Sequence, residues 1–243
     1  MNGLIDGLLL PLQGLRLVFR PGFRRYMIVP LLLNIVIFWL LAWLGTHYFD
    51  GFMNHYLPED AWWSFLRPVL WVVFALAYAM LMFYGFTILA NLIASPFNSV
   101  LAARLEEHLT GQRPDGAQTG VLAAIGPAVR AELNKLLYMA SRMVPLLILL
   151  AVSALIPGLN LVVTVLWLLA GFWFLTLEYL DYPMANHDLP PQRQRELLRQ
   201  RRFKSLAFGA GVTGMMLVLG FVAMPASVAG ATLYWVRDLR VRA

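Results

Sequence analysis

The sequence contains no cysteine and, although it is basic, only two lysines, Lys135 and Lys204. Without cysteine the chain forms no disulfide, holds no metal through thiolates and has no cysteine nucleophile. Only 13% of the residues are charged, and four stretches of more than 20 residues carry no Asp, Glu, Lys or Arg. A content of 60% hydrophobic residues in a chain of 243 is wrong for a soluble domain and predicts a membrane protein.

The motifs of common enzyme and metal sites are also missing. The four histidines are scattered and form no ligand pair of the His-Glu-x-x-His kind. There is no Gly-x-Ser-x-Gly elbow, Walker loop or dinucleotide fingerprint. Because no ionisable Asp, Glu, Lys or Arg lies inside the uncharged stretches, we expect neither an enzyme nor a cofactor or metal site. The amino-terminal residues have no basic region or cleavage site, so we expect no cleaved signal peptide.

Two of the uncharged stretches predict full membrane spans. The first, Tyr26–Thr46, has 21 residues. As a helix it would be roughly 31 Å long, close to the thickness of a bilayer's hydrocarbon core. The second, 68–103, has 36 residues and exceeds a bilayer. Ser95-Pro96 supplies an N-cap and a first-turn proline, so we predict a span near 68–94 and a new helix from residue 96.

The other two uncharged stretches are interrupted by proline. Stretch 143–177 is broken at Pro157-Gly158, and stretch 206–236 is broken at Met224-Pro225. One limb of the first has about 14 residues and one limb of the second about 11, which is short for crossing a bilayer. We therefore favour two re-entrant, hemi-penetrating hairpins over two ordinary two-span hairpins. The predicted fold is an all-α integral membrane protein in a single domain, 1–243.

Basic residues gather on one side of the predicted membrane. Apart from the net acidic loop 47–67, every segment between the uncharged stretches is rich in arginine. With two full crossings these basic segments share one side, which the positive-inside rule identifies as the cytoplasm. There we predict helices within 96–142 and 190–204. The arginines flank apolar stretches, which favours lipid headgroups or a small anion over nucleic acid.

A Pro-Gly turn with two arginines precedes the first span. In Pro21-Gly22-Phe23-Arg24-Arg25, free backbone N–H groups, the positive end of a helix dipole and guanidinium forks together suit an oxyanion. Adjacent arginines diverge on a regular helix, so they converge on one ligand only if the turn is irregular, which Gly22 permits. The alternative is that Arg24 and Arg25 anchor the helix to lipid phosphate. Physical chemistry alone slightly favours that alternative.

Polar residues in or beside the uncharged stretches are weaker candidates for an anion route or pore. Arg104 and Glu107 lie three residues apart on one face of a predicted helix, where they line the route or form a surface ion pair. The remaining candidates are asparagines that can hydrogen-bond broken helix ends: Asn91, Asn98 and Asn160.

Several motifs in register resemble the CysZ sulfate permease family. They are the Pro21–Arg25 turn followed by Val29-Pro30-Leu31-Leu32-Leu33-Asn34, then Ala94-Ser95-Pro96-Phe97-Asn98 leading into Leu105-Glu106-Glu107, and finally Glu178-Tyr179-Leu180-Asp181-Tyr182-Pro183-Met184 with Asn186 and His187. Length, order of the stretches and their breaks agree as well, so the resemblance covers nearly the whole chain. The family's third turn position is usually aliphatic, and Phe23 departs from that pattern.

The resemblance implies sulfate uptake across the bacterial inner membrane, feeding cysteine biosynthesis. It also implies two long membrane helices with two pairs of hemi-penetrating helices, an oligomeric assembly, and a sulfate site at Gly22, Phe23, Arg24 and Arg25. A channel and a proton-coupled carrier are both compatible with it. The competing hypothesis is a non-transporting membrane scaffold whose basic cytoplasmic face binds lipid or a partner protein.

Overall fold

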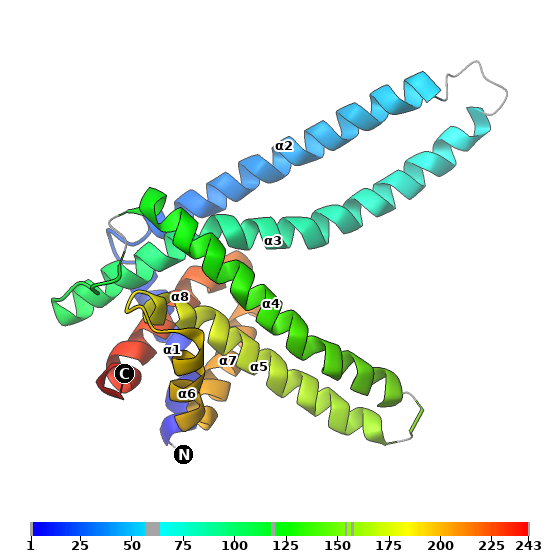
Figure 1. The fold of residues 1–243 in the computed structure, drawn as a ribbon. Helices are drawn as coiled ribbons and strands as arrows, with labels where there is room; N and C mark the ends of the chain where they lie inside the picture. Colours follow the sequence, from blue (N-terminus) through cyan, green and yellow to red (C-terminus); the bar gives the residue numbers. More distant parts are fainter. Residues whose placement is uncertain (1, 57–63, 118–119, 154, 157, 243) are drawn as a thin grey trace. The chain divides into compact units, whose positions relative to one another are not determined.

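All the regular structure in the described part of the chain is helical (Figure 1). The computed structural model describes residues 2–56, 64–117, 120–153, 155–156 and 158–242. Four stretches of helix there are long and apolar enough to cross a membrane: Arg25–Phe49, Val121–Ser153, Leu159–Ala185 and Arg202–Leu239. The predicted all-α membrane fold is therefore confirmed. The chain divides into a unit of residues 28–94 and a larger unit made of 1–27 and 95–243.

The smaller unit is a helical hairpin. Helix α2, Arg25–Tyr56, contributes residues from 28 onward, and helix α3, Arg67–Thr110, contributes residues up to 94. A short turn of helix, Ser64–Leu66, precedes α3. Between the two helices Phe49 stacks on Phe74, with 3.7 Å between ring centroids. Apolar side chains on the hairpin are more than half exposed, as expected of a surface in lipid: Val36, Trp39, Val72 and Leu76.

Helix α3 runs without interruption through Ser95-Pro96, so the predicted break at this point is wrong. A proline inside a helix removes one backbone hydrogen bond and bends the helix more often than it ends it. Ser95 and Asn98 are almost fully buried, and the packing of this segment offsets the lost hydrogen bond. The boundary between the two units nevertheless falls at Ser95.

Helices α4, Val121–Ser153, and α5, Leu159–Ala185, form the first broken hairpin. The predicted break is confirmed, and Gly158 has a φ of +85° at the start of α5. The apolar limb before the break is joined to the predicted cytoplasmic helix in one helix of 33 residues. Limb length therefore no longer argues against a full crossing, and re-entrance stays a prediction.

The second broken stretch is interrupted earlier than its proline suggests. Helix α7, Arg202–Leu219, ends at Gly220, which has a φ of +52°, and a turn of 3-10 helix, Gly220–Val222, leads into α8, Ala223–Tyr234. Pro225 is the third residue of α8, in a first turn where a missing N–H costs nothing. The predicted break at Met224-Pro225 is thus displaced to Gly220.

The arginine-rich segment and the carboxyl terminus complete the larger unit. The predicted helix 190–204 is divided at Arg201, whose backbone is not helical: helix α6, Pro191–Gln200, ends before it and α7 begins after it. A π-helical turn, Trp235–Leu239, and a 3-10 turn, Arg240–Arg242, follow α8. These turns carry Trp235 and Leu239 into the core.

Helix α1, Asn2–Val18, was not predicted from the sequence, yet it packs against both α7 and α8 in the larger unit (Figure 1). Its buried face combines Leu10, Leu17 and Val18 with two glycines. One of them, Gly14, lies so close to α8 that a Cβ atom would overlap backbone atoms there. The absence of a side chain therefore sets the distance between α1 and α8.

Gly14→Ala is expected to destabilise the fold by about 1–3 kcal/mol, because the added methyl group forces α1 away from α8. Gly126→Ala in α4 is the matched control, since a Cβ there meets no atom within 4 Å. That control should be neutral or stabilising by up to about 1 kcal/mol through helix propensity. Thermal unfolding in detergent measures both, and equal stability of the two variants would contradict the close α1–α8 approach.

Candidate functional site

The Pro21–Arg25 turn joins α1 to α2 by an irregular path. Gly22 has a φ of +96°, a left-handed conformation that favours glycine. The N–H of Phe23 donates to the Arg20 carbonyl at 3.2 Å. The N–H groups of Tyr26 and Met27, at the start of α2, likewise donate to the carbonyls three residues before them. The N–H groups of Gly22 and Arg24 bond to no backbone carbonyl in the described part of the chain. The turn thus carries two backbone donors beside its arginines.

A pocket of about 560 Å³ opens beside this turn. It is lined by the turn on one side and the last turns of α3 on the other: Arg20, Pro21, Gly22, Phe23, Arg25 and Tyr26, with Arg104, Glu107 and His108. Three guanidinium groups and one carboxylate leave the lining with two positive charges even when the histidine is neutral. We call this the turn pocket.

The two arginines of the turn point in different directions. Arg25 lines the turn pocket, and its guanidinium lies 4.9 Å from the centroid of the Tyr26 ring and donates to the Tyr26 hydroxyl at 3.1 Å. Arg24 does not line the pocket; its Nε donates to the Phe19 carbonyl at 2.7 Å. Arg25 is therefore placed to meet a ligand, whereas Arg24 closes the turn onto the end of α1.

The end of α3 supplies the opposite wall of the turn pocket. Arg104 and Glu107 form the ion pair that their spacing suggested, with 3.2 Å between Nη1 and Oε2. Both side chains are about two-fifths exposed, so the pair is weak and easily exchanged for another partner. The His108 ring lies edge-on to Phe23, with 5.6 Å between centroids. That contact holds the third position of the turn against α3.

The three asparagine candidates lie apart from the turn pocket. Asn98 is buried in α3, and Asn160 is exposed in the first turn of α5, beside the α4–α5 connection. Asn91 belongs to the smaller unit. None of them lines the turn pocket among the residues described, so only Arg104 and Glu107 of the route candidates join the turn.

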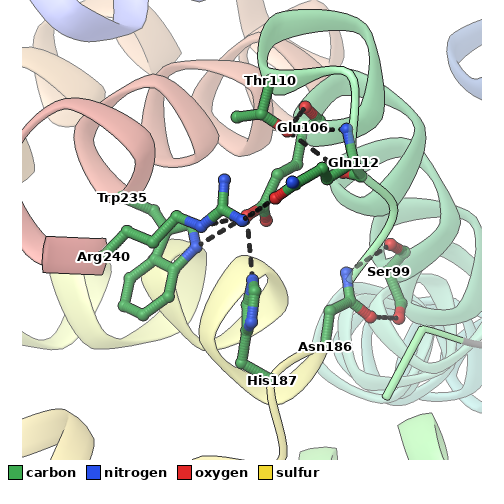
Figure 2. Close-up of polar contacts among 8 residues, drawn as sticks. All are labelled: Ser99, Glu106, Thr110, Gln112, Asn186, His187, Trp235 and Arg240. Carbon is green, nitrogen blue, oxygen red and sulfur yellow. Dashed lines mark hydrogen bonds and ion pairs between the residues drawn. The ribbon is translucent and has the colours of Figure 1, made fainter. Parts of the chain in front are cut away.

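Figure 2 shows a second polar cluster, centred on Glu106, which is fully buried. His187 Nε2 lies 2.9 Å from Glu106 Oε1, and the Trp235 indole N–H donates to the same oxygen at 3.2 Å. Arg240 Nε is 3.6 Å from it. The cluster therefore ties α3 to the end of α5 and to the carboxyl-terminal turns, and we call it the Glu106 cluster.

Sequence reasoning missed the Glu106 cluster, because the histidines are scattered along the chain. The only signal was that Glu106 and His187 fall in two of the motifs behind the family resemblance. Next to His187, the Asn186 amide donates to the Ser99 carbonyl at 3.0 Å (Figure 2). Among the residues that the structure describes, no group of three His, Asp or Glu is arranged to hold a metal ion.

Comparison with known proteins decides the family. The family described as "Sulfate transporter CysZ/Etoposide-induced protein 2.4" matches residues 10–225. The chain belongs to this family. Its CysZ relatives include the sulfate transporter CysZ of Pseudomonas aeruginosa, 37% identical over 95% of this chain and 94% of the relative. The CysZ proteins of Pseudomonas fluorescens (39% identical, 93% and 91% covered) and Salmonella typhimurium (37%, 95% and 91%) are similar in the same way.

The CysZ relatives confirm the resemblance inferred from the motifs. They are named as transporters and not as enzymes, which agrees with the expectation that this chain is not an enzyme. Together with the apolar helices, they identify the chain as a multi-pass protein of the bacterial inner membrane.

Proposed function

We propose that this protein carries sulfate across the bacterial inner membrane, for cysteine biosynthesis, and that sulfate binds in the turn pocket. The observation behind the proposal is that relatives named sulfate transporter CysZ cover nearly the whole chain, turn included. The turn pocket also has three guanidinium groups in its lining, next to a turn whose Gly22 and Arg24 N–H groups bond to no backbone carbonyl in the described residues, which supports the proposal.

The charge of the turn pocket matches a dianion. Arg20, Arg25 and Arg104 carry three positive charges and Glu107 carries one negative charge, which leaves two to balance sulfate. Arginine forks donate paired hydrogen bonds to oxyanions, and the Gly22 N–H adds a backbone donor. In this proposal sulfate displaces Glu107 from Arg104, because the exposed ion pair is worth less than a charge-assisted bond to a dianion.

Lipid and a second copy of the chain are the proposed partners besides sulfate. The apolar residues on the long helices are widely exposed and call for lipid or another subunit to cover them. Arg199 and Arg202 near the end of α6 are exposed and suit anionic headgroups.

Labelled sulfate uptake into proteoliposomes tests the proposed function. The purified protein should raise uptake above that of empty liposomes. Excess chloride should compete weakly, because a monoanion leaves one positive charge of the pocket unbalanced. Raising the salt concentration should weaken sulfate binding, because the pocket is open to solvent.

Uptake no higher than in empty liposomes would contradict transport. If the same protein then bound vesicles of anionic lipid, the scaffold hypothesis would replace it. Phosphate and chloride competing as well as sulfate would contradict a site matched to this dianion.

A further inference from the structure

Besides the turn pocket and the Glu106 cluster, a further group of charged side chains lies between α4 and α5. Three carboxylate oxygens surround the ammonium group of Lys135: Glu132 Oε2 at 3.0 Å, Glu178 Oε2 at 3.2 Å and Asp181 Oδ2 at 3.5 Å. Lys135 also lies over the Tyr182 ring, 4.8 Å from its centroid. These groups, which we call the Lys135 cluster, flank the uncharged stretch 143–177 and do not lie inside it.

The Lys135 cluster is shielded from water. The Glu132 side chain is 2% exposed, and those of Lys135, Asp181 and Glu178 are between 12% and 17% exposed. Charges in such surroundings interact strongly and are tolerated only when they are paired. Any net charge that the cluster carries therefore raises the free energy of the folded protein.

The charges of the Lys135 cluster do not balance. One ammonium group faces three carboxyl groups, which leaves two negative charges if all three are ionised. Arg130 and Arg195 line the adjoining cavity, but neither forms an ion pair with these carboxylates among the described residues. Arg195 instead lies over the Tyr138 ring, 4.6 Å from its centroid. Neighbouring carboxylates that share a buried site retain a proton for this reason.

The hydrogen bonds distinguish the three carboxyl groups of the cluster. Asp181 Oδ1 accepts a hydrogen bond from the Gln194 amide at 3.1 Å, a neutral donor in addition to Lys135. Glu132 Oε2 is buried, and its only charged partner among the described residues is the Lys135 ammonium group at 3.0 Å. Glu178 Oε2 approaches the same ammonium group at 3.2 Å, so both glutamates rely on Lys135 for charge balance.

We propose that the Lys135 cluster is a proton-binding site in which one of the two glutamates, Glu132 or Glu178, retains a proton. The proton reduces the excess negative charge that a single ammonium group leaves unbalanced. The inference does not depend on the proposed sulfate site, because it uses none of the residues of the turn pocket.

A cavity connects the cluster with the surroundings of the protein. It has a volume of about 510 Å³ and is lined by α4, α5 and α6, with Lys135 and Asp181 in its wall. Because Lys135 and Asp181 form part of its wall, the cavity offers a route by which the cluster can exchange its proton. When the proton leaves at high pH, repulsion between the carboxylates of α4 and α5 should loosen the contact between these helices.

Infrared spectroscopy of the reconstituted protein tests the proton directly, because a protonated carboxyl group absorbs apart from a carboxylate. The wild-type protein should show a carboxylic-acid band at neutral pH that disappears in alkaline buffer. Glu178→Gln and Glu132→Gln should each lose the band, since removal of one negative charge makes the proton unnecessary. Glu196→Gln is the control, because Glu196 is an exposed partner of Arg193 on α6, and it should keep the band.

The pH dependence of thermal unfolding in detergent gives a second measurement. The folded protein holds a proton that the unfolded chain releases at neutral pH, so stability should fall as pH rises. Glu178→Gln should flatten that dependence and Glu196→Gln should not. A wild-type protein without the acid band at neutral pH would overturn the proposal, as would a band that survives in both cluster variants. Stabilisation by sodium in place of protons would also overturn it.

Discussion

Arg25→Ala is expected to weaken sulfate binding roughly 10- to 100-fold, the effect of losing a charge-assisted hydrogen bond of about 1.5–3 kcal/mol. Arg25 lines the turn pocket with an exposed guanidinium, so its removal takes one of the three guanidinium groups from the lining. Arg25→Lys keeps the charge but loses the planar fork, and should lose less affinity than the alanine variant. Isothermal titration with sulfate in detergent measures both variants.

Arg16→Ala is the matched control for Arg25. Arg16 is an exposed arginine in the last turn of α1 and does not line the turn pocket. Its replacement should leave sulfate affinity within about twofold, because exposed charges at a distance are screened by salt. Equal losses in the two variants would show that sulfate responds only to the overall positive charge, and would remove the proposed site.

Arg24→Ala separates positioning from direct contact. Arg24 bonds the Phe19 carbonyl and does not line the pocket. Its replacement is expected to loosen the turn and to weaken sulfate binding less than Arg25→Ala does. The sequence could not distinguish these two neighbours, because their roles depend on the path of the backbone through Gly22.

The membrane class and the position of the turn were predictable from the sequence, because both depend on local composition. The long uncharged stretch after Arg25 is enough to identify α2, and Pro157-Gly158 is enough to divide α4 from α5. Helix α1 was missed because its apolar residues lie on both faces: Leu8 and Leu12 are exposed while Leu10 is buried. The sequence alone therefore does not show which face of this helix packs against the protein.

The errors at proline have a common physical cause. Ser95-Pro96 resembles a helix start, and Pro225 resembles a break, when each is considered with its neighbours alone. Buried packing carries α3 across Pro96, and the positive φ of Gly220 ends α7 five residues before Pro225. Local sequence rules identify the residue types that can end or interrupt a helix. Tertiary contacts decide at which of these residues the helix does end.

Glu106 could not be recognised as the more important of two adjacent glutamates. Glu106 and Glu107 share their chemistry, their helix and their place in the same motif. The structure separates them completely: Glu106 is fully buried among His187 and Trp235, whereas Glu107 is partly exposed beside Arg104. Only the long-range contacts of α3 contain that information.

Glu106→Ala is expected to destabilise the protein by about 3–5 kcal/mol, the usual cost of removing one partner from a buried charged network. The loss leaves the ring nitrogen of His187 and the indole N–H of Trp235 without their acceptor, inside the core. Arg240 also loses its nearest carboxylate oxygen, at 3.6 Å. Chemical unfolding in detergent measures the difference in free energy.

Glu107→Ala is the closest possible control, since it removes an identical group from the next residue of the same helix. Its partner Arg104 is exposed, so the change should cost less than about 1 kcal/mol. The two variants should also differ in kind: Glu107→Ala frees Arg104 and should strengthen sulfate binding, whereas Glu106→Ala should weaken folding at any sulfate concentration. Similar unfolding energies for the two variants would contradict the buried network. In that case the carboxyl-terminal turns would be held to α3 by apolar packing of Trp235 and Leu239 alone.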